Sequence, residues 1–212
     1  MTLLASVVGA DGYPGGWIAV TLEDGRFAGV SRCASFADVL RLGAAIAGVD
    51  IPIGVGPRRA DGEARRFVGP RASSVFPSLP QAALDAESYP AALAACRTAT
   101  GKGISKQAWM LRAKILEVQA HRSTGVIEVH PEVSFRALAG RTFPSKHAPE
   151  GLAERRHVLA TAGLELPERE PGVPEVDLLD AAAVAWSAWR ALRGEARTLP
   201  PDPGPGEPTI TY

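Results

Sequence analysis

The order of the predicted elements in residues 3–52 constrains the fold more than any other feature of the sequence. Apolar runs predict three strands, at residues 3–10, 17–22 and 26–33. Asp24-Gly25, between the last two runs, is a strong hairpin signal. Ser35 then caps a helix with apolar residues at helical spacing, and residues 46–52 return as a fourth strand. A right-handed crossover carries that strand back beside the first, so we expect an α/β sheet with the first strand near its centre.

The rest of the chain predicts one more strand and several helices. The fifth strand is expected at residues 125–130, and further helices are expected after Ser105 and over residues 151–162 and 177–193. Residues 56–103 are interpreted as a helical insertion, with a helix at about 82–96. The Pro-rich tail at residues 198–212 is extended, and its end would add an edge strand or cap a groove. Together these elements predict a single domain with a mixed five-stranded sheet, a three-strand meander followed by parallel strands, and flanking helices.

Composition and charge narrow the functional classes. A chain of 212 residues can bury a sizeable core as one domain. It has 23 basic and 23 acidic residues and therefore no net positive charge, which argues against non-specific binding of long nucleic-acid duplexes. Binding of short or single-stranded substrates is still compatible with this charge. No apolar run approaches the roughly 20 residues of a membrane span, so no membrane association is expected. Cys33 and Cys96 form neither a disulfide framework nor a metal spacing, which favours a cytoplasmic location.

Four aspartates are placed where they can meet. Asp11 and Asp50 lie near the carboxyl ends of the first and fourth strands, and adjacent parallel strands are about 4.8 Å apart. Asp177 and Asp180 are three residues apart, so they share one face of the last helix. Four carboxylates at one point repel one another without a cation, and an all-oxygen ligand set suits Mg²⁺ or Mn²⁺. Two such ions about 3.5–4 Å apart catalyse phosphodiester cleavage in other enzymes.

Each of these aspartates also has a purely structural interpretation. Asp177 can cap the last helix and Asp180 can favour its positive N-terminus. Asp11 precedes Gly12 and can be a turn residue, and Asp50 can bond to backbone amides at the end of its strand. The four-acid site competes with these interpretations.

A second group of polar residues lies on the fifth strand. If the strand geometry persists, Glu128, His130 and Glu132 alternate onto one face, although Pro131 can break the strand. Glu128 would then be a further metal ligand, and His130 a general acid or a phosphate contact. A buried, hydrogen-bonded histidine is the alternative.

Five arginines are clustered in the predicted insertion: Arg58, Arg59, Arg65, Arg66 and Arg71. They would clamp a phosphate over the metal site, because guanidinium binds phosphate in a bidentate way. Ser74 and Lys102 would add donors to the same substrate. The alternative is a solvated helix surface with internal ion pairs, since Asp61 and Arg65 have a helical ion-pair spacing.

Six short motifs occur in order along nearly the whole chain: Gly9-Ala10-Asp11-Gly12 with Gly16-Trp17, Val49-Asp50-Ile51-Pro52-Ile53-Gly54, Ser74-Val75-Phe76-Pro77, Gly101-Lys102-Gly103-Ile104-Ser105 with Gln107, Glu128-Val129-His130-Pro131-Glu132 with Ser134-Phe135, and Asp177-Leu178-Leu179-Asp180-Ala181. Together they resemble the domain-of-unknown-function 429 family, described as predicted nucleases of the ribonuclease-H-like fold. The start of the last helix also resembles Holliday-junction resolvases of that superfamily. Those proteins use one acid on the first strand, one on the fourth and a pair on the last helix.

The resemblance and the residue patterns together define the expected site. The expected catalytic residues are Asp11, Asp50, Glu128, Asp177 and Asp180, and the four aspartates are the expected metal ligands. The expected substrate-binding residues are Arg59, Arg65, Arg71, Ser74, Lys102, Gln107 and His130. We expect a nuclease that uses Mg²⁺ or Mn²⁺ on a short, structured or single-stranded nucleic acid. The alternatives are a phosphohydrolase or phosphotransferase acting on a small phosphate ester, and a non-catalytic binding module.

Overall fold

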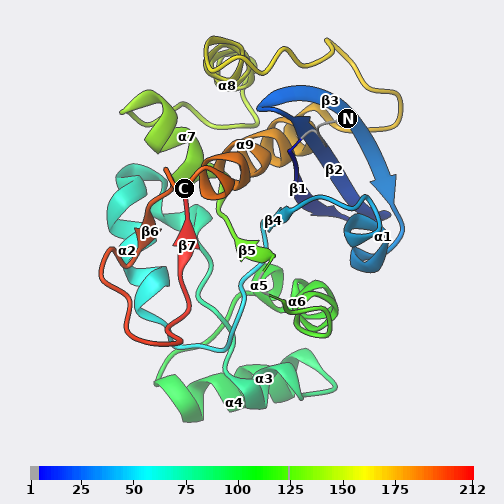
Figure 1. Cartoon of the computed structure of the whole chain (residues 1–212). Helices are drawn as coiled ribbons and strands as arrows, with labels where there is room; N and C mark the ends of the chain where they lie inside the picture. Colours follow the sequence, from blue (N-terminus) through cyan, green and yellow to red (C-terminus); the bar gives the residue numbers. More distant parts are fainter. Residues whose placement is uncertain (1–4, 124) are drawn as a thin grey trace.

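The computed structural model describes residues 5–123 and 125–212. Its main sheet has five strands in the order β3-β2-β1-β4-β5 (Figure 1). The strands are β1 (Ser6–Tyr13), β2 (Gly16–Glu23), β3 (Arg26–Cys33), β4 (Ile46–Val49) and β5 (Val126–Glu128). The first three form an antiparallel meander, whereas β4 is parallel to β1 and β5 is parallel to β4. The predicted α/β class and the mixed five-stranded sheet are therefore confirmed.

The two faces of the sheet are covered differently. Helix α9 (Glu175–Leu192) lies along one face (Figure 1), where Val7, Ile18 and Val20 are fully buried against it. On the other face Val8 and Trp17 belong to a separate cluster with α1 (Phe36–Leu40) and α6 (Arg112–Gln119). Successive residues of a strand point to opposite faces, so both faces can be apolar only because the strands carry continuous apolar runs.

Glycines let α9 approach the centre of the sheet at backbone distance. A Cβ atom on Gly9 would lie 2.1 Å from the backbone nitrogen of Ala185. A Cβ atom on Gly48 would lie 2.9 Å from a methyl carbon of Val184. Both glycines face α9. Side chains alternate between the two faces of a strand, so Asp11, two residues after Gly9, and Asp50, two residues after Gly48, point to the same side as these glycines.

Several predicted helices are shorter or divided in the structure. The helix expected at about 82–96 is two helices, α3 (Gln81–Leu84) and α4 (Tyr89–Thr100). Helix α4 starts afresh because Pro90 suits a first turn, where Ser88 caps the free backbone amides. The helix expected after Ser105 is also divided, into α5 (Lys106–Met110) and α6. Helix α1 has only five residues and ends at Leu40.

The remaining elements lie outside the main sheet. They are α2 (Arg59–Val68), the 3₁₀ helix η1 (Gly69–Ser74), α7 (Pro131–Ala139), α8 (Pro149–Thr161), β6 (Thr198–Leu199) and β7 (Ile210–Thr211). Strand β7 pairs with β6 and forms a parallel bridge from Thr211 to Val129. The predicted strand at the end of the tail is confirmed. Within the described ranges no helix is both long and apolar enough to cross a membrane.

Candidate functional site

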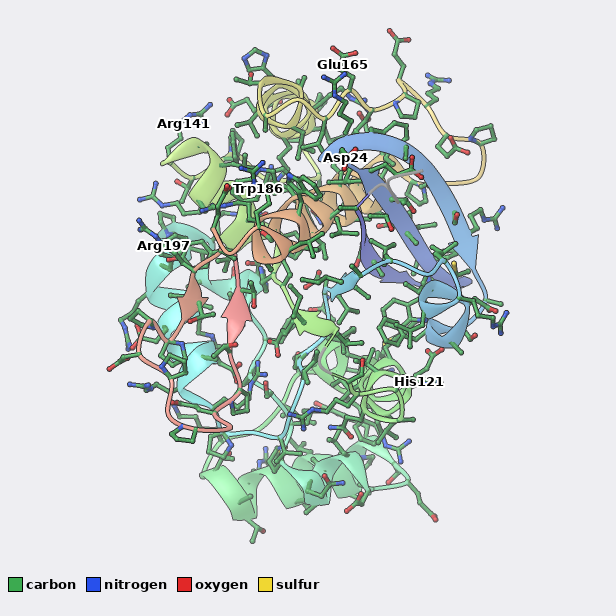
Figure 2. All side chains as sticks on the ribbon, viewed as in Figure 1. Asp24, His121, Arg141, Glu165, Trp186 and Arg197 are labelled. Atoms are coloured by element: carbon green, nitrogen blue, oxygen red, sulfur yellow. The ribbon has the colours of Figure 1, made fainter. Side chains whose placement is uncertain are left out.

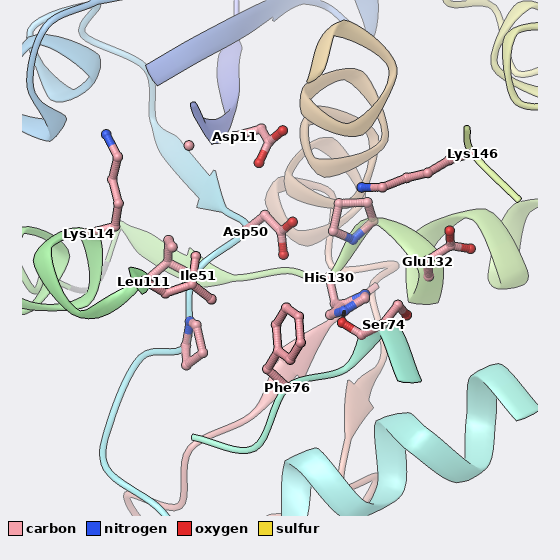
Figure 3. A pocket seen from close by; sticks show the side chains of 13 residues that line it. Asp11, Asp50, Ile51, Ser74, Phe76, Leu111, Lys114, His130, Glu132 and Lys146 are labelled. Carbon is pink, nitrogen blue, oxygen red and sulfur yellow. Dashed lines mark hydrogen bonds between the residues drawn. The ribbon is translucent and has the colours of Figure 1, made fainter. Parts of the chain in front are cut away.

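A cavity of about 170 Å³ opens where β1 and β4 end, beside the start of α9 (Figure 3). Its lining combines carboxylates, two lysines, a histidine and apolar side chains: Asp11, Gly12, Asp50, Ile51, Pro52, Ser74, Phe76, Leu111, Lys114, His130, Pro131, Glu132 and Lys146. Ligands of open α/β sheets bind outside the carboxyl ends of the strands, which is where this cavity lies.

The parallel register of β1 and β4 places Asp11 and Asp50 side by side. Ala10 pairs with Val49, and the backbone N–H of Asp50 donates to the carbonyl of Ala10 at 3.0 Å. Strand β1 continues to Tyr13, so the prediction that Asp11 lies in a turn is wrong; it pairs with Ile18 inside the ladder. Figure 3 shows both carboxylates pointing into the same space.

The second pair of aspartates comes from α9. The N-cap of α9 is Pro174, so Asp177 lies within the first turn and the capping interpretation of Asp177 is wrong. Asp180, one turn later, is only 2% exposed. Burial raises the pKa of Asp177, and the charge of Asp180 raises it further. A buried carboxylate that does not cap its helix needs a positive charge or another hydrogen-bond donor nearby to remain ionised.

The four aspartates are close enough to perturb one another. Burial raises the pKa of Asp11 well above its usual range, and the charges of Asp50, Asp180 and Asp177 add to that rise. Burial likewise raises the pKa of Asp50, to about 6, against the opposing effect of His130. Of the predicted acids, Asp11 and Asp50 line the cavity, whereas Asp177 and Asp180 lie outside its lining and act on Asp11 through their charges. Among the described residues, no three His, Cys, Asp or Glu side chains have the arrangement of a metal site.

Lys146 neutralises part of this negative charge. It lies in the segment between α7 and α8, and its Nζ is 2.5 Å from Oδ2 of Asp180. Burial lowers the pKa of Lys146, but Asp180, Asp50 and Asp11 outweigh that effect and raise it above the usual value. The ammonium group is thus paired with Asp180, and its charge also acts on Asp50 and Asp11.

Lys114 lies on the opposite side of the cavity. Its Nζ donates to the carbonyl of Gly16 at 2.5 Å and lies 4.3 Å from the centre of the Trp17 ring. Burial lowers the pKa of Lys114. Neither lysine belongs to a sequence pattern that indicated a site; only four of the 23 basic residues are lysines, and two of those four line this cavity.

His130 and Ser74 form the wall next to Asp50. The Nε2 atom of His130 is 3.2 Å from the carbonyl oxygen of Ser74, whereas its Nδ1 atom is buried without a hydrogen-bond partner. His130 is the N-cap residue of α7, which starts at Pro131. The strand therefore does not continue, and the prediction that Glu128, His130 and Glu132 share one strand face is wrong.

Glu128 lies outside the lining of the cavity. It accepts hydrogen bonds from Nη2 of Arg58 at 2.7 Å and from the backbone N–H of Ile53 at 2.6 Å. Arg58 also binds Asp61 at 2.6 Å, and its side chain is 3% exposed. Glu128 therefore belongs to a buried ion-pair network with Arg58 and Asp61, and its oxygens are committed there.

Glu132 remains at the cavity through a different network. Its Oε1 accepts from Nη2 of the fully buried Arg155 at 2.6 Å, and Arg71 is 3.8 Å from the same oxygen. Arg71 is thus near the cavity, behind Glu132. No spacing in the sequence indicated Arg155, because it reaches Glu132 from a different helix.

The other expected clamp residues lie elsewhere. Arg59 pairs with Asp202 and Glu207 of the tail, and Arg65 donates twice to the carbonyl of Val75. The predicted Asp61–Arg65 pair does not form, because Asp61 binds Arg58. The lining of the acidic cavity includes neither Lys102 nor Gln107, and both are exposed. Within the described chain, the cations that line the cavity are Lys114 and Lys146.

Comparisons with known proteins add a family but no described activity. Neither the curated proteins nor the solved structures gave a match to this chain. One family model, described as protein of unknown function (DUF429), matches residues 9–204. That range contains all four aspartates, both cavity lysines and His130. The chain therefore belongs to the DUF429 family of proteins.

Proposed function

We propose that this protein is a metal-dependent phosphodiester hydrolase of the ribonuclease-H-like type, a nuclease that uses Mg²⁺ or Mn²⁺. The observation that carries the proposal is the convergence of four aspartates at the end of two parallel strands: the charges of Asp50, Asp177 and Asp180 raise the pKa of Asp11, and Asp180 also raises the pKa of Asp50 and Asp177. A scaffold gains nothing from four acids that destabilise one another. The pair of buried, unbridged cysteines suits a cytoplasmic protein.

The donor set fits a divalent cation. Its ligands are carboxylate oxygens, which Mg²⁺ and Mn²⁺ prefer. The raised pKa values of Asp11, Asp50 and Asp180 mean that ionising these groups costs free energy in the folded protein, and a bound cation removes that cost. Lys146 supplies one positive charge at Asp180, so a metal ion bound to that carboxylate would have to share it with the ammonium group or displace it.

The protein's own side chains supply the remaining parts of the mechanism. When bound, the cations would lower the pKa of a water molecule and stabilise the charge that develops on the phosphate. Lys114 and Lys146 approach the cavity from opposite sides, and either can bind a non-bridging phosphate oxygen. Nε2–H of His130 faces the carbonyl of Ser74, so the free Nδ1 can accept a proton from the attacking water when the ring is neutral and can deliver a proton to the leaving oxygen when the ring is the imidazolium. Phe76 and Leu111 limit the access of bulk water.

A second candidate is a phosphohydrolase or phosphotransferase for a small phosphate ester. The observation that favours it is the size of the cavity, about 170 Å³, which is below the roughly 300–1,000 Å³ of usual ligand pockets. A single phosphate group and its nearest atoms fit, whereas a polymer has to lie across the opening. A non-catalytic binding module remains the third hypothesis, and the experiment below also tests it.

Activity assays with Mn²⁺ separate these candidates. Labelled single-stranded, hairpin, branched and RNA–DNA hybrid substrates are incubated beside small phosphate esters. Asp11→Asn and Asp180→Asn should each reduce cleavage at least a hundredfold, because an amide cannot replace an anionic ligand of the ions. Asp24→Asn is the matched control: Asp24 has φ of 48°, which asparagine tolerates, and lies at the opposite end of the sheet (Figure 2).

The outcomes are distinct. Cleavage of nucleic acids that depends on Asp11 and Asp180 supports the nuclease. Turnover confined to small esters favours the second candidate. Cleavage that survives both substitutions comes from a contaminant, and an inactive protein that still binds Mn²⁺ through these aspartates is a binding module.

A further inference from the structure

A second and larger cavity, of about 670 Å³, lies away from the aspartates. It is lined by residues of α2, by residues of the end of α4 and of the loop that follows it, and by Pro77, Ser78 and Pro80. The two cavities lie on either side of one segment: Ser74 and Phe76 line the acidic cavity, whereas Pro77 and Ser78 line the second one. The second cavity is within the usual size range for ligands of drug size.

The polar groups at this cavity already form hydrogen bonds with one another. Asp61 binds Arg58 at 2.6 Å and accepts from the backbone N–H and the hydroxyl of Ser78 at 2.8 and 3.1 Å. Beside it, the N–H of Gly56 donates to the carbonyl of Leu79 at 2.9 Å. These bonds hold the wall in place before any ligand binds, and a preformed site loses less entropy on binding.

Two cations at this cavity are not neutralised. Arg65 uses Nε and Nη2 to bind the carbonyl of Val75, which fixes the guanidinium plane and leaves Nη1 free to donate. Among the described residues, no carboxylate lies within ion-pair distance of Lys102. The remaining lining is mostly apolar or small: Pro57, Gly62, Pro77, Pro80, Cys96, Ala99, Thr100, Gly103 and Ile104.

We propose that the second cavity binds a small phosphate monoester of the size of a mononucleotide, with its phosphate at Arg65 and Lys102 and its base against the apolar part of the lining. A phosphate monoester carries a charge of about −1.5 to −2 at pH 7, which matches the two free cations better than a carboxylate does. The apolar and proline-rich wall then covers the body of the ligand. Arg65 and Lys102, expected from the sequence to serve the acidic site, instead form an anion site of their own. The inference goes beyond the proposed hydrolase and does not require it.

Binding is measured by calorimetry with the full chain in EDTA, so that divalent ions at the aspartates play no part. The probes are the four ribonucleoside 5′-monophosphates, with the corresponding nucleosides and inorganic phosphate for comparison. At least one monophosphate should bind at least tenfold more tightly than its nucleoside and than phosphate alone. Lys102→Met and Arg65→Gln should each weaken that binding at least tenfold. Ala99→Trp, at the exposed rim, should block it.

Two matched controls come from neighbouring surface positions. Lys106 and Arg66 are exposed and do not line the cavity, so Lys106→Met and Arg66→Gln should bind as the unchanged protein does. Binding should also persist in Asp11→Asn, which separates this site from the acidic one. The proposal is overturned if no monophosphate binds at millimolar concentration, if binding survives Lys102→Met, or if Asp11→Asn abolishes it.

Discussion

Replacing Asp50 with asparagine should stabilise the metal-free protein near neutral pH. Burial is the main reason why the pKa of Asp50 rises from 3.8 to about 6, with Asp180 and Glu128 adding to it and His130 and Lys146 opposing it. Each pKa unit is worth about 1.4 kcal/mol, so the ionised carboxylate costs the folded state about 3 kcal/mol. Asparagine is a neutral, nearly isosteric replacement and should recover up to that amount.

The pH dependence has a definite sign. Because the folded protein holds the Asp50 proton more tightly than the unfolded chain, the free energy of unfolding falls as pH rises from about 4 to about 6. Asp50→Asn lacks this decrease. The variant should therefore match the unchanged protein near pH 4 and exceed it by up to about 3 kcal/mol at pH 7.5.

Urea unfolding in EDTA at pH 4.5, 6 and 7.5 measures this difference. Asp24→Asn serves as the control and should show no such pH-dependent gain. With Mn²⁺ added, the order should reverse, because the unchanged protein gains binding free energy that the variant loses. A variant that is no more stable at pH 7.5, or equally stabilised at every pH, would refute the account of a buried and crowded carboxylate.

Three further substitutions test other parts of the structure. Lys146→Met leaves Asp180 buried without its cation, so the free energy of unfolding measured with urea should fall by about 2 kcal/mol. This is below the roughly 3–5 kcal/mol of fully buried pairs because Lys146 is 32% exposed, and Mn²⁺ should restore most of the loss. Gly9→Ala places a methyl group against the backbone of Ala185, so the melting temperature should fall by well over 10 °C or soluble protein should be lost. Arg59→Ala breaks exposed ion pairs with the tail and should lower the free energy of unfolding by under about 1 kcal/mol, with unchanged turnover. If Arg59 instead clamped the substrate phosphate, its loss would raise KM.

The sheet was predictable because its signals are local. Each strand is an apolar run between turn residues, and the crossover rule then orders β1 and β4. The positions of Asp11 and Asp50 follow from that order and from the period of two along a strand. The division of the predicted helices was harder to predict. Pro90 lies in the first turn of α4, a position that a helix tolerates, so its presence did not show where the preceding helix ends.

The partners of the charged residues were not predictable in the same way. Spacing arguments detect neighbours three or four residues apart, and they placed Arg65 with Asp61. The real partners are distant in sequence: Arg58 with Glu128, and Lys146 with Asp180. Such pairs depend on how whole elements pack, so the sequence indicated the acids of the site but not the cations that face them.

The close approach of α9 to the sheet has a consequence for the order of folding. Two of the four aspartates lie on α9 and the other two on the sheet, and contacts between them span more than a hundred residues of chain. Closing so large a loop is slow, because the chain loses conformational entropy before the contacts that stabilise the closed loop are formed. Backbone packing at Gly9 leaves no room for a loosely docked helix. We therefore expect the cluster of acids to form in a late and cooperative step, so that a nascent or partly unfolded chain would have no assembled site for the proposed hydrolysis.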